Sequence, residues 1–517
     1  MVLVRPLELP GDRPATAAVI GGGASGTLTA ACLLRAAAAA SVAVSVLLID
    51  KDGRHGLGRA YATQHPAHLL NAPAGRMSAV PSDPGSLVRW AQAAGIAAGP
   101  GSFLARMDYG RYLQDTLADA ERAAAPASSV RRLTAEVIGL TTAGQATPGQ
   151  ATADQQQAAD LRSPAARLTG SRRARAADRL PDLAEPQVRV HLVDGRHLDA
   201  DVAVLATGSL PPAAPCPVPA TPRYVADPWS PGALDRVADG SPVLILGTGL
   251  TMLDVAVAVT GSRPDSIVYA ISRHALLPRE HRQHGSQQEC AENGGPGAIQ
   301  GLTDGHRDLA GLIRRVRAEA GQSAAGWQPV VDALRPHSQQ IWQQLREREQ
   351  RMFLRHVARY WEVHRHRVPP ATASRTDALR AAGRLRVLRG RVSQVTADGD
   401  RLTVLVEQGS AGVAAIRTGW LVNGTGPGTD VCSTRDRLLR QLLDAGLAAP
   451  DPHRLGIRTD GHGAVITAAG QPSSWLYALG PLLRGQLYET TAIPEIRDQA
   501  SALASRLVAL AAPQHAA

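Results

Sequence analysis

The sequence predicts an α/β fold with two Rossmann-like dinucleotide-binding domains and a helical insertion, and three observations support this prediction. An apolar strand pattern at residues 16–20 runs into a glycine cluster and then into an alanine- and leucine-rich helix pattern. The same strand–glycine–helix order recurs from Pro242. A helical pattern over residues 306–366 interrupts the second unit before strands return over residues 384–422. Alternating strands and helices are typical of parallel α/β sheets.

Length and composition agree with a globular protein of several domains. The chain has 517 residues, of which 44% are hydrophobic and 19% charged, so it can bury a large core. Its net charge of +10 is spread along the chain and 3% of its residues are aromatic, so we expect no nucleic-acid partner. Lys51 is the only lysine, which excludes a P-loop because that motif would need a second lysine.

Cysteine spacing and hydropathy exclude further classes of protein. The four cysteines form no CxxC pair, so neither a dithiol redox site nor a zinc ribbon is expected. No metal site is predicted, because His281, His284 and Cys290 lie on a loop pattern without positioned carboxylates. The N-terminus lacks a signal-peptide core, and the longest apolar stretch, residues 27–49, is broken by Arg35. We therefore expect no membrane partner and a cytoplasmic location.

The first glycine cluster is a complete GxGxxG motif made by Gly21, Gly23 and Gly26. The first glycine permits a tight turn, the second lets a pyrophosphate approach the backbone, and the third allows close packing of helix on strand. The next strand ends at Asp50, whose carboxylate would accept hydrogen bonds from an adenosine ribose. A purely structural glycine turn is the less favoured alternative. The motif therefore predicts a dinucleotide, and at the N-terminal unit we expect FAD.

The second glycine turn contains Gly247 and Gly249 but has Met252 in place of the third glycine, which makes its signal weaker. The strand that follows leads into Arg273, and no acid is present there. An arginine at this place suits the 2′-phosphate of NADPH. A solvated surface role for Arg273 is an equally supported alternative. Two dinucleotide folds in one chain predict FAD together with NADPH.

Short segments along most of the chain share the motifs of one known family. They are GRAY at 58–61, HLLNAPA at 68–74, MS at 77–78, YGRYL at 109–113, LATG at 205–208, SRH at 272–274, LP at 277–278, NGTGP at 423–427, ALGP at 478–481, ETTA at 489–492 and EIR at 495–497. Together they span nearly the whole chain apart from residues 141–187. The sequence resembles the bacterial FAD/NAD(P)-binding flavoprotein family that includes urate hydroxylases and amine N-monooxygenases.

The resemblance implies an FAD-dependent, NAD(P)H-using monooxygenase that hydroxylates a small nitrogen-containing substrate, either urate-like or an amine. In such enzymes reduced flavin and molecular oxygen form a hydroperoxide that delivers the hydroxyl group, while the protein supplies orientation. Two alternatives stay open. One is an FAD-dependent NAD(P)H dehydrogenase or reductase without oxygen insertion, and the other is a non-catalytic dinucleotide-binding protein.

The two turns and the matching segments together name the candidate site residues. The cofactor-binding candidates are Gly21, Gly23, Ala24, Ser25, Gly26, Asp50, Lys51, Leu70, Asn71, Thr207, Gly208, Gly247, Gly249, Thr251, Arg273, Gly424, Gly480 and Thr490. Asn71 is the candidate beside the isoalloxazine, and no catalytic triad is required. The substrate candidates are Arg279, His281 and Arg355, because arginine can pair bidentately with an anionic substrate. For each of these residues alone, a surface location is the favoured alternative.

The domain boundaries follow changes in composition and period. In chain order we expect an N-terminal part of the FAD-binding domain at 1–140, a disordered insertion at 141–187, the return of the FAD domain and the domain crossing at 188–210, an NADPH-binding domain at 211–283, a Gly-rich loop and helical insertion at 284–383, the return strands of the NADPH domain at 384–427, and the C-terminal part of the FAD-binding domain at 428–517. The segment at 141–187 lacks an apolar period, and the Gly-rich loop is a candidate lid.

Overall fold

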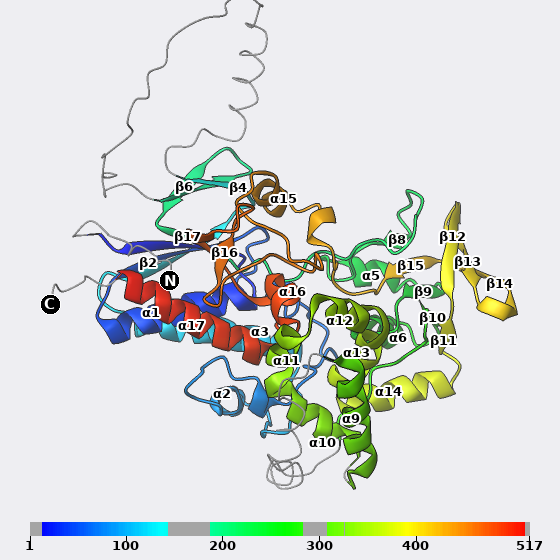
Figure 1. Cartoon of the computed structure of the whole chain (residues 1–517). Coiled ribbons are helices and arrows are strands. Elements are labelled where there is room, and N and C mark those ends of the chain that lie inside the picture. Colours follow the sequence, from blue (N-terminus) through cyan, green and yellow to red (C-terminus); the bar gives the residue numbers. More distant parts are fainter. Residues whose placement is uncertain (1–12, 143–186, 283–307, 325, 512–517) are drawn as a thin grey trace, which may run out of the picture.

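The computed structural model describes residues 13–142, 187–282, 308–324 and 326–511 (Figure 1). The predicted insertion at 141–187 lies outside the described residues except for its ends. The Gly-rich loop that was expected to form a lid lies outside them as well. Within the described ranges, no helix is both long and apolar enough to cross a membrane.

The first unit is built on a six-stranded sheet of order β16-β17-β7-β1-β2-β3. Its strands are β1 (Ala15–Ile20), β2 (Val44–Asp50), β3 (Ser129–Thr134), β7 (Val202–Leu205), β17 (Pro472–Ala478) and β16 (Ala464–Ile466). All pairings are parallel except that of β16 with β17. The strands come from three separate parts of the sequence, so this sheet is completed by the C-terminal part of the chain.

Both faces of this sheet are covered, which is why its strands read as continuous apolar runs. In β1, Ala17 and Val19 face one hydrophobic cluster while Ala18 and Ile20 face another. Helices α1 (Ala24–Ala40), α3 (Arg106–Arg122) and α17 (Ile493–Ala511) lie side by side on the first face (Figure 1). The second face carries α15 (Arg437–Asp444) and the antiparallel sheet of β4 (Val137–Thr142), β5 (Val188–Leu192) and β6 (His197–Ala200). Smaller elements of this unit are η1 (Ala74–Arg76), α2 (Ser86–Ala93), η5 (Val431–Ser433), η6 (Gly480–Leu483) and α16 (Arg484–Leu487).

The second unit has a five-stranded parallel sheet of order β11-β10-β9-β15-β8. The strands are β8 (Tyr224–Val225), β9 (Val243–Leu246), β10 (Val268–Ser272), β11 (Leu385–Arg389) and β15 (Trp420–Asn423). One face packs against α5 (Ala233–Val237), α6 (Leu250–Ser262) and α14 (Pro370–Ala381). The other face is covered by an antiparallel sheet of β12 (Arg391–Asp398), β13 (Arg401–Glu407) and β14 (Val413–Thr418), with η4 (Gly409–Ala411) in a connecting loop. The two predicted dinucleotide-binding units are thus both present.

The helical insertion lies between β10 and β11 in sequence but packs against the first unit in space. It comprises α9 (Leu309–Gln322), α10 (Trp327–Leu334), η2 (Arg335–His337), α11 (Ser338–Gln344), α12 (Glu347–Met352), η3 (Phe353–Val357) and α13 (Ala358–Arg365). Trp342 is buried, stacks on Tyr488 and donates its indole N–H to the Gly485 carbonyl at 2.8 Å. Trp361 is partly buried at the edge of the same cluster. The insertion is therefore joined to the second unit by the chain and to the first unit by packing.

Candidate functional site

A cavity of about 740 Å³ runs along the carboxyl ends of the first unit's strands. It extends to the amino end of α6 in the second unit and to the helical insertion. Ligands of open α/β sheets bind at the carboxyl ends of the strands, and cofactor cavities are typically about 300–1,000 Å³. The position and the volume of this cavity are therefore those of a dinucleotide site.

The first glycine turn has the backbone geometry that the motif predicts. Gly21 has φ +108°, and a Cβ built on it would lie 2.4 Å from the carbonyl oxygen of Ala206. A Cβ on Gly26 would lie 1.8 Å from the carbonyl oxygen of Gly21. Glycine is required at both positions because any side chain would overlap backbone. Strand β1, the start of α1 and the exit of β7 therefore meet in direct backbone contact.

The amino end of α1 faces the cavity. Ala24 and Ser25 line the cavity wall, and Gly23, the residue before the helix, makes no side-chain cap. The first N–H groups of a helix have no acceptor within the helix, and together with the helix dipole they favour an anion. These residues can hold a pyrophosphate.

Asp50 also lies on the cavity wall, at the end of β2. One of its carboxylate oxygens accepts the Gly22 N–H at 3.0 Å, and the other accepts the N–H groups of Asp52 at 3.0 Å and Arg54 at 3.2 Å. The side chain thus orders the glycine turn and the loop after β2. A carboxylate has about four acceptor sites, so the oxygen that accepts only the Gly22 N–H can still accept one ribose hydroxyl.

The structure brings most of the predicted cofactor-binding residues together at this cavity. Those that line it are Gly21, Gly23, Ala24, Ser25, Asp50, Lys51, Leu70, Asn71, Thr207, Gly208 and Thr251. Those that do not are Gly26, Gly247, Gly249, Arg273, Gly424, Gly480 and Thr490. Thr490 is fully buried and donates its hydroxyl to the Gly480 carbonyl at 3.0 Å, so its neighbours Thr491 and Pro481 form the wall instead.

The second glycine turn repeats the geometry of the first turn outside the cavity. Gly247 has φ +107°, and a Cβ on it would lie 2.6 Å from the carbonyl oxygen of Gly424. A Cβ on Gly249 would meet no atom within 4 Å, and α6 begins there without a side-chain cap. The turn is therefore open to a ligand at its second glycine.

In the second unit, Thr248 and Ser272 occupy the positions that correspond to Gly22 and Asp50 of the first unit. The Thr248 hydroxyl lies 2.9 Å from the Ser272 hydroxyl, which also accepts the Ala275 N–H at 2.9 Å. Arg273 follows directly, is exposed, and has no ion-pair partner among the described residues. No carboxylate is therefore present at this strand end to repel a 2′-phosphate.

The three substrate candidates do not line the cavity. Arg279 and Arg355 are exposed, while His281 donates its Nε2–H to the backbone carbonyl of Asn71 at 2.9 Å. Burial lowers the pKa of His281 to about 4, so the ring is neutral at pH 7. His281 therefore holds the Asn71 backbone from behind the cavity wall.

An ion pair that the sequence analysis missed joins the two units at the cavity. Arg106, the first residue of α3, pairs with Asp254 of α6 at 2.9 Å, and both side chains are buried. His68 is fully buried and donates its Nε2–H to the Asp254 carbonyl at 3.0 Å, and burial lowers its pKa. A second pair joins Arg59 to Asp227 at 2.6 Å. His68 belongs to the HLLNAPA segment that carries the family resemblance. Nothing in the sequence around Arg106 indicates a role in the site.

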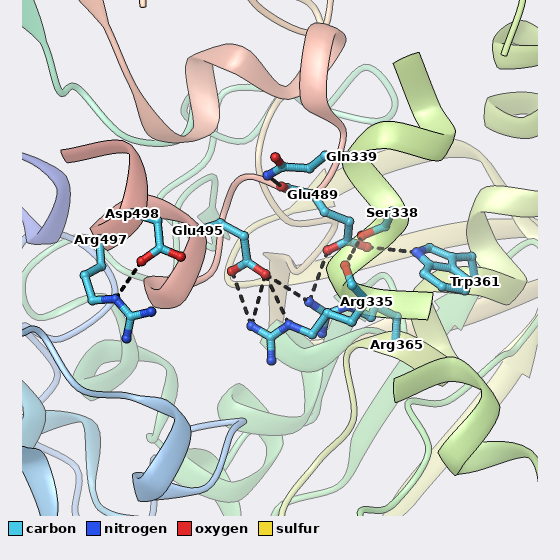
Figure 2. Close-up of polar contacts among 9 residues, drawn as sticks. All are labelled: Arg335, Ser338, Gln339, Trp361, Arg365, Glu489, Glu495, Arg497 and Asp498. Atoms are coloured by element: carbon cyan, nitrogen blue, oxygen red, sulfur yellow. Dashed lines mark hydrogen bonds and ion pairs between the residues drawn. The ribbon is translucent and has the colours of Figure 1, made fainter. Parts of the chain in front are cut away.

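The insertion contributes polar residues that were also missed as site residues. Arg335, Arg365 and His366 line the end of the cavity beside the amino end of α17. Figure 2 shows the two arginines facing Glu489 and Glu495 of the C-terminal segment. Within the described part of the chain, no group of three or more His, Cys, Asp or Glu side chains could hold a metal ion. His284 and Cys290 lie outside that part.

Comparison with known proteins supports a dinucleotide-binding fold. Residues 18–169 match the model of a family described as FAD-NAD(P)-binding, which includes the first glycine turn and Asp50. Binding of FAD and a nicotinamide dinucleotide is thus supported by the family model as well as by the turns. No curated protein matches the chain.

Solved structures share the fold over nearly the whole chain. L-lysine 6-monooxygenase from Pseudomonas syringae is 14% identical, covers 96% of this chain and 99% of its own, and has a TM-score of 0.58. Ornithine hydroxylase from Pseudomonas aeruginosa is 14% identical, with coverage of 97% and 100% and a TM-score of 0.55. The ornithine N-hydroxylase of Kutzneria sp. 744, whose structure holds reduced FAD, NADP+ and L-ornithine, is 15% identical, with coverage of 96% and 99% and a TM-score of 0.53. The α/β fold of two dinucleotide-binding domains is therefore confirmed.

Proposed function

We propose that the chain is an FAD-dependent, NADPH-using monooxygenase that hydroxylates a small nitrogen-containing substrate. The observation that carries the proposal is that one cavity joins the first glycine turn, the amino end of α6 and the helical insertion. A flavin, a nicotinamide and a substrate could meet in such a space. The three solved structures described above carry the names of amine-hydroxylating enzymes on the same fold.

FAD would be held by Gly21, Gly23 and Ser25 at its pyrophosphate and by Asp50 at its ribose. When bound, the flavin supplies hydride acceptance and oxygen activation. NADPH would be held by the second turn, with Gly249 at the pyrophosphate and Arg273 at the 2′-phosphate. The uncapped starts of α1 and α6 favour phosphate at both places.

The remaining wall residues orient ligands and exclude water. Leu70, Met77 and Ile493 give the cavity an apolar wall, which would exclude water from a bound flavin. The buried pair of Arg106 and Asp254 holds the second unit against the first. The neutral ring of His281 fixes the Asn71 backbone, so that this segment can present polar groups to the isoalloxazine.

The test is a substrate-dependent oxygen assay with the purified protein. We expect the protein to contain flavin, and NADPH oxidation to rise when a suitable amine is added, with one hydroxylated product formed per oxygen consumed. Flavin reduction by NADPH without oxygen insertion into any nitrogen-containing compound would support the reductase alternative instead. Failure to retain FAD, even after incubation with excess cofactor, would support a different kind of protein altogether.

A further inference from the structure

Two ion pairs cross from the first unit to the second, and both have the same polarity. Arg106 pairs with Asp254 at 2.9 Å, and Arg59 pairs with Asp227 at 2.6 Å. Each arginine belongs to the first unit and each aspartate to the second. Both arginines line the cavity, as does Asp254. Opposite charges therefore hold the units together at the space in which the two dinucleotides are expected to meet.

The pair of Arg106 and Asp254 is the better shielded of the two. Its side chains are 11% and 10% exposed, whereas those of Arg59 and Asp227 are 38% and 23% exposed. The Arg106 guanidinium also lies over the Trp229 ring, 5.6 Å from its centroid. A buried pair is screened less by salt than an exposed pair, and removing one partner leaves an uncompensated charge. This pair is therefore the stronger restraint on the second unit.

The same two residues hold the cavity wall at residues 68–71. Arg106 donates its Nε–H to the Leu69 carbonyl at 3.0 Å and its backbone N–H to the His68 carbonyl at 2.8 Å. The His68 ring donates its Nε2–H to the Asp254 carbonyl at 3.0 Å. Asp254 thus contacts the first unit through its backbone as well as through its carboxylate. The wall segment is therefore tied to α6, the helix whose amino end is expected to face NADPH.

A further contact ties the other end of this segment to the second unit. His281 donates its Nε2–H to the Asn71 carbonyl at 2.9 Å. The backbone N–H of His281 donates to the Val368 carbonyl at 3.0 Å, and Val368 packs in the core of the second unit. Residues 68–71 belong to the first unit in sequence, but groups of the second unit hold them at both ends.

The proposed reaction depends on how the two units are aligned. In its reductive step a hydride, which carries two electrons, leaves NADPH and reduces the flavin, and NADPH becomes NADP+. Such a transfer requires the reacting atoms to lie about 3–3.5 Å apart, and a misplacement of about 1 Å can slow a reaction about a hundredfold. The flavin is expected beside Leu70 and Asn71 on the first unit, whereas NADPH is expected at the second. The contacts between the units therefore set the distance between the two cofactors.

We propose, on the basis of the function proposed above, that Arg106 and Asp254 are positioning residues for flavin reduction. They fix the second unit, and with it the nicotinamide, against the flavin wall of the first unit. Their role is to set the distance between the two dinucleotides rather than the affinity for either one. The rate of flavin reduction therefore depends on this ion pair more strongly than the binding of FAD or NADPH does.

The experiment measures anaerobic reduction of the flavin-loaded protein by stopped-flow absorbance. Asp254→Asn keeps the shape of the side chain and removes the charge that opposes Arg106. We expect reduction at saturating NADPH to be about tenfold to a hundredfold slower, with the flavin content and the Kd of NADP+ unchanged. N-benzyl-dihydronicotinamide lacks the dinucleotide that the second unit would bind, so reduction by this reagent should keep its wild-type rate. An unchanged rate with NADPH, or an equal loss with both reductants, would overturn the proposal.

A double variant and a matched control assign the effect to this pair. Arg106→Gln combined with Asp254→Asn leaves no buried charge unpaired and should show the same selective loss with NADPH. The control is Asp201→Asn, which removes a buried aspartate whose partner, Arg13, lies in the same unit at 2.5 Å. Its flavin should be reduced at the wild-type rate. The same selective slowing in the control would show that loss of any buried ion pair is sufficient, and it would contradict the proposal.

Hydrogen–deuterium exchange of the cofactor-free protein gives a readout that does not depend on flavin reduction. Asp254→Asn should raise exchange of the backbone amides at residues 68–71, because one of the ties that hold this segment is lost. Asp201→Asn should leave exchange there unchanged. Unchanged exchange at residues 68–71 in Asp254→Asn would contradict the connection between the wall segment and the second unit.

The wild type separates this proposal from the proposed function. If NADPH does not reduce the flavin of the wild type, the proposed function is wrong and the ion pair has no role in reduction. If NADPH reduces the wild type and the variants equally fast, only the positioning role is wrong. If the variants lose reduction by NADPH selectively but no amine is hydroxylated by the wild type, the positioning role is supported and the chain is a reductase.

Discussion

The two glycine turns of this chain share one backbone geometry at their first glycine and differ at the third position. Gly21 and Gly247 have nearly the same positive φ, +108° and +107°. At either position a Cβ would fall on a carbonyl oxygen, that of Ala206 in the first unit and that of Gly424 in the second. In both units the segment that leaves the returning strand therefore lies directly over the turn.

At the third position the first unit has a glycine, whereas the second unit has a large apolar side chain. A Cβ on Gly26 would overlap the Gly21 carbonyl, whereas Met252 is fully buried within the apolar core of the second unit. In the first unit the helix backbone itself is the packing surface, and in the second unit a side chain fills that place. The first glycine is thus a requirement of the turn, while the third is a requirement of how closely its helix packs.

The largest expected effect comes from substitutions at this third position of the two turns. Gly26→Ala should abolish folding or lower the free energy of unfolding by more than about 4 kcal/mol, because backbone has to move to admit the methyl group. Met252→Leu should cost less than about 1.5 kcal/mol, since it conserves volume in an apolar site. Soluble yield and denaturant unfolding measure both changes. Similar stability of the two variants would contradict the described backbone contact.

The second glycines test whether the two turns bind different dinucleotides. Gly249→Ala should fold normally, because its methyl group meets no atom within 4 Å. It should raise KM for NADPH about tenfold to a hundredfold by displacing a phosphate from charge-assisted hydrogen bonds, with flavin content unchanged. Gly23→Ala places its methyl group 3.3 Å from the Gly58 Cα and should instead lower the flavin-to-protein absorbance ratio. Normal NADPH kinetics in Gly249→Ala would remove the second turn from the binding site.

The strand ends differ in charge, and Arg273 tests this difference. Arg273→Ala should raise KM for NADPH about tenfold and leave KM for NADH unchanged, since solvent weakens an exposed charge contact. Arg417→Ala, an exposed substitution on β14 with the same loss of charge, is the control. Steady-state kinetics with both nucleotides measures the ratio. If the wild type already uses both nucleotides equally well, Arg273 is a surface residue only.

The smallest expected effect concerns the acids that anchor the two turn-bearing strands. Asp201 accepts the Thr16 N–H near the start of β1, and Asp239 accepts the Ser241 N–H ahead of β9. Burial opposes ionisation of Asp239, but hydrogen bonds from Ser241, Trp420 and Arg223 outweigh it and lower the pKa of Asp239 to about 2. Because the folded pKa lies below the unfolded value of 3.8, the stabilisation is present above pH 4 and disappears as the pH falls towards 2.

Thermal unfolding of the wild type and of Asp239→Asn between pH 2 and pH 5 measures this contribution. The two Tm values should converge as the pH falls, and the wild type should be more stable above pH 4. The difference should be small, because the Asp239 side chain is about one-third exposed. A constant difference across this range would show that charge on Asp239 is not involved.

Local patterns were sufficient to predict the fold. Each strand–glycine–helix unit is encoded by neighbouring residues, and the structure confirms both units as β1–α1–β2 and β9–α6–β10. The strand pattern at residues 16–20 was expected ahead of the first glycine turn and is found as β1, Ala15–Ile20. Apolar runs predict buried parallel strands because both faces of such sheets are covered.

The far end of the cavity could not be predicted in the same way. Arg335 and Glu495 lie 160 residues apart in sequence, and no local period brings them together. Arg355 and Arg365 both lie in the helical insertion, and the sequence pattern does not distinguish them. Packing against the first unit nevertheless buries Arg365 and leaves Arg355 exposed. Tertiary contacts decide which arginine of the insertion reaches the cavity. The spacing of residues in the sequence does not reveal these contacts.

The placement of β17 has a consequence for how the chain folds during its synthesis. Residues 472–478 pair with β7 and thereby separate it from β16 in the first sheet, while every strand of the second sheet lies between Tyr224 and Asn423. On a ribosome the second unit can close its sheet while the first still lacks two strands and α17. Sheet pairing across long sequence separations is slow. The sheet that contains β1 therefore stays incomplete until the last part of the chain has been synthesised. Ribosome-bound nascent chains that have released β15 but not β16 from the ribosome should therefore protect β9 from protease while β1 and α1 remain accessible.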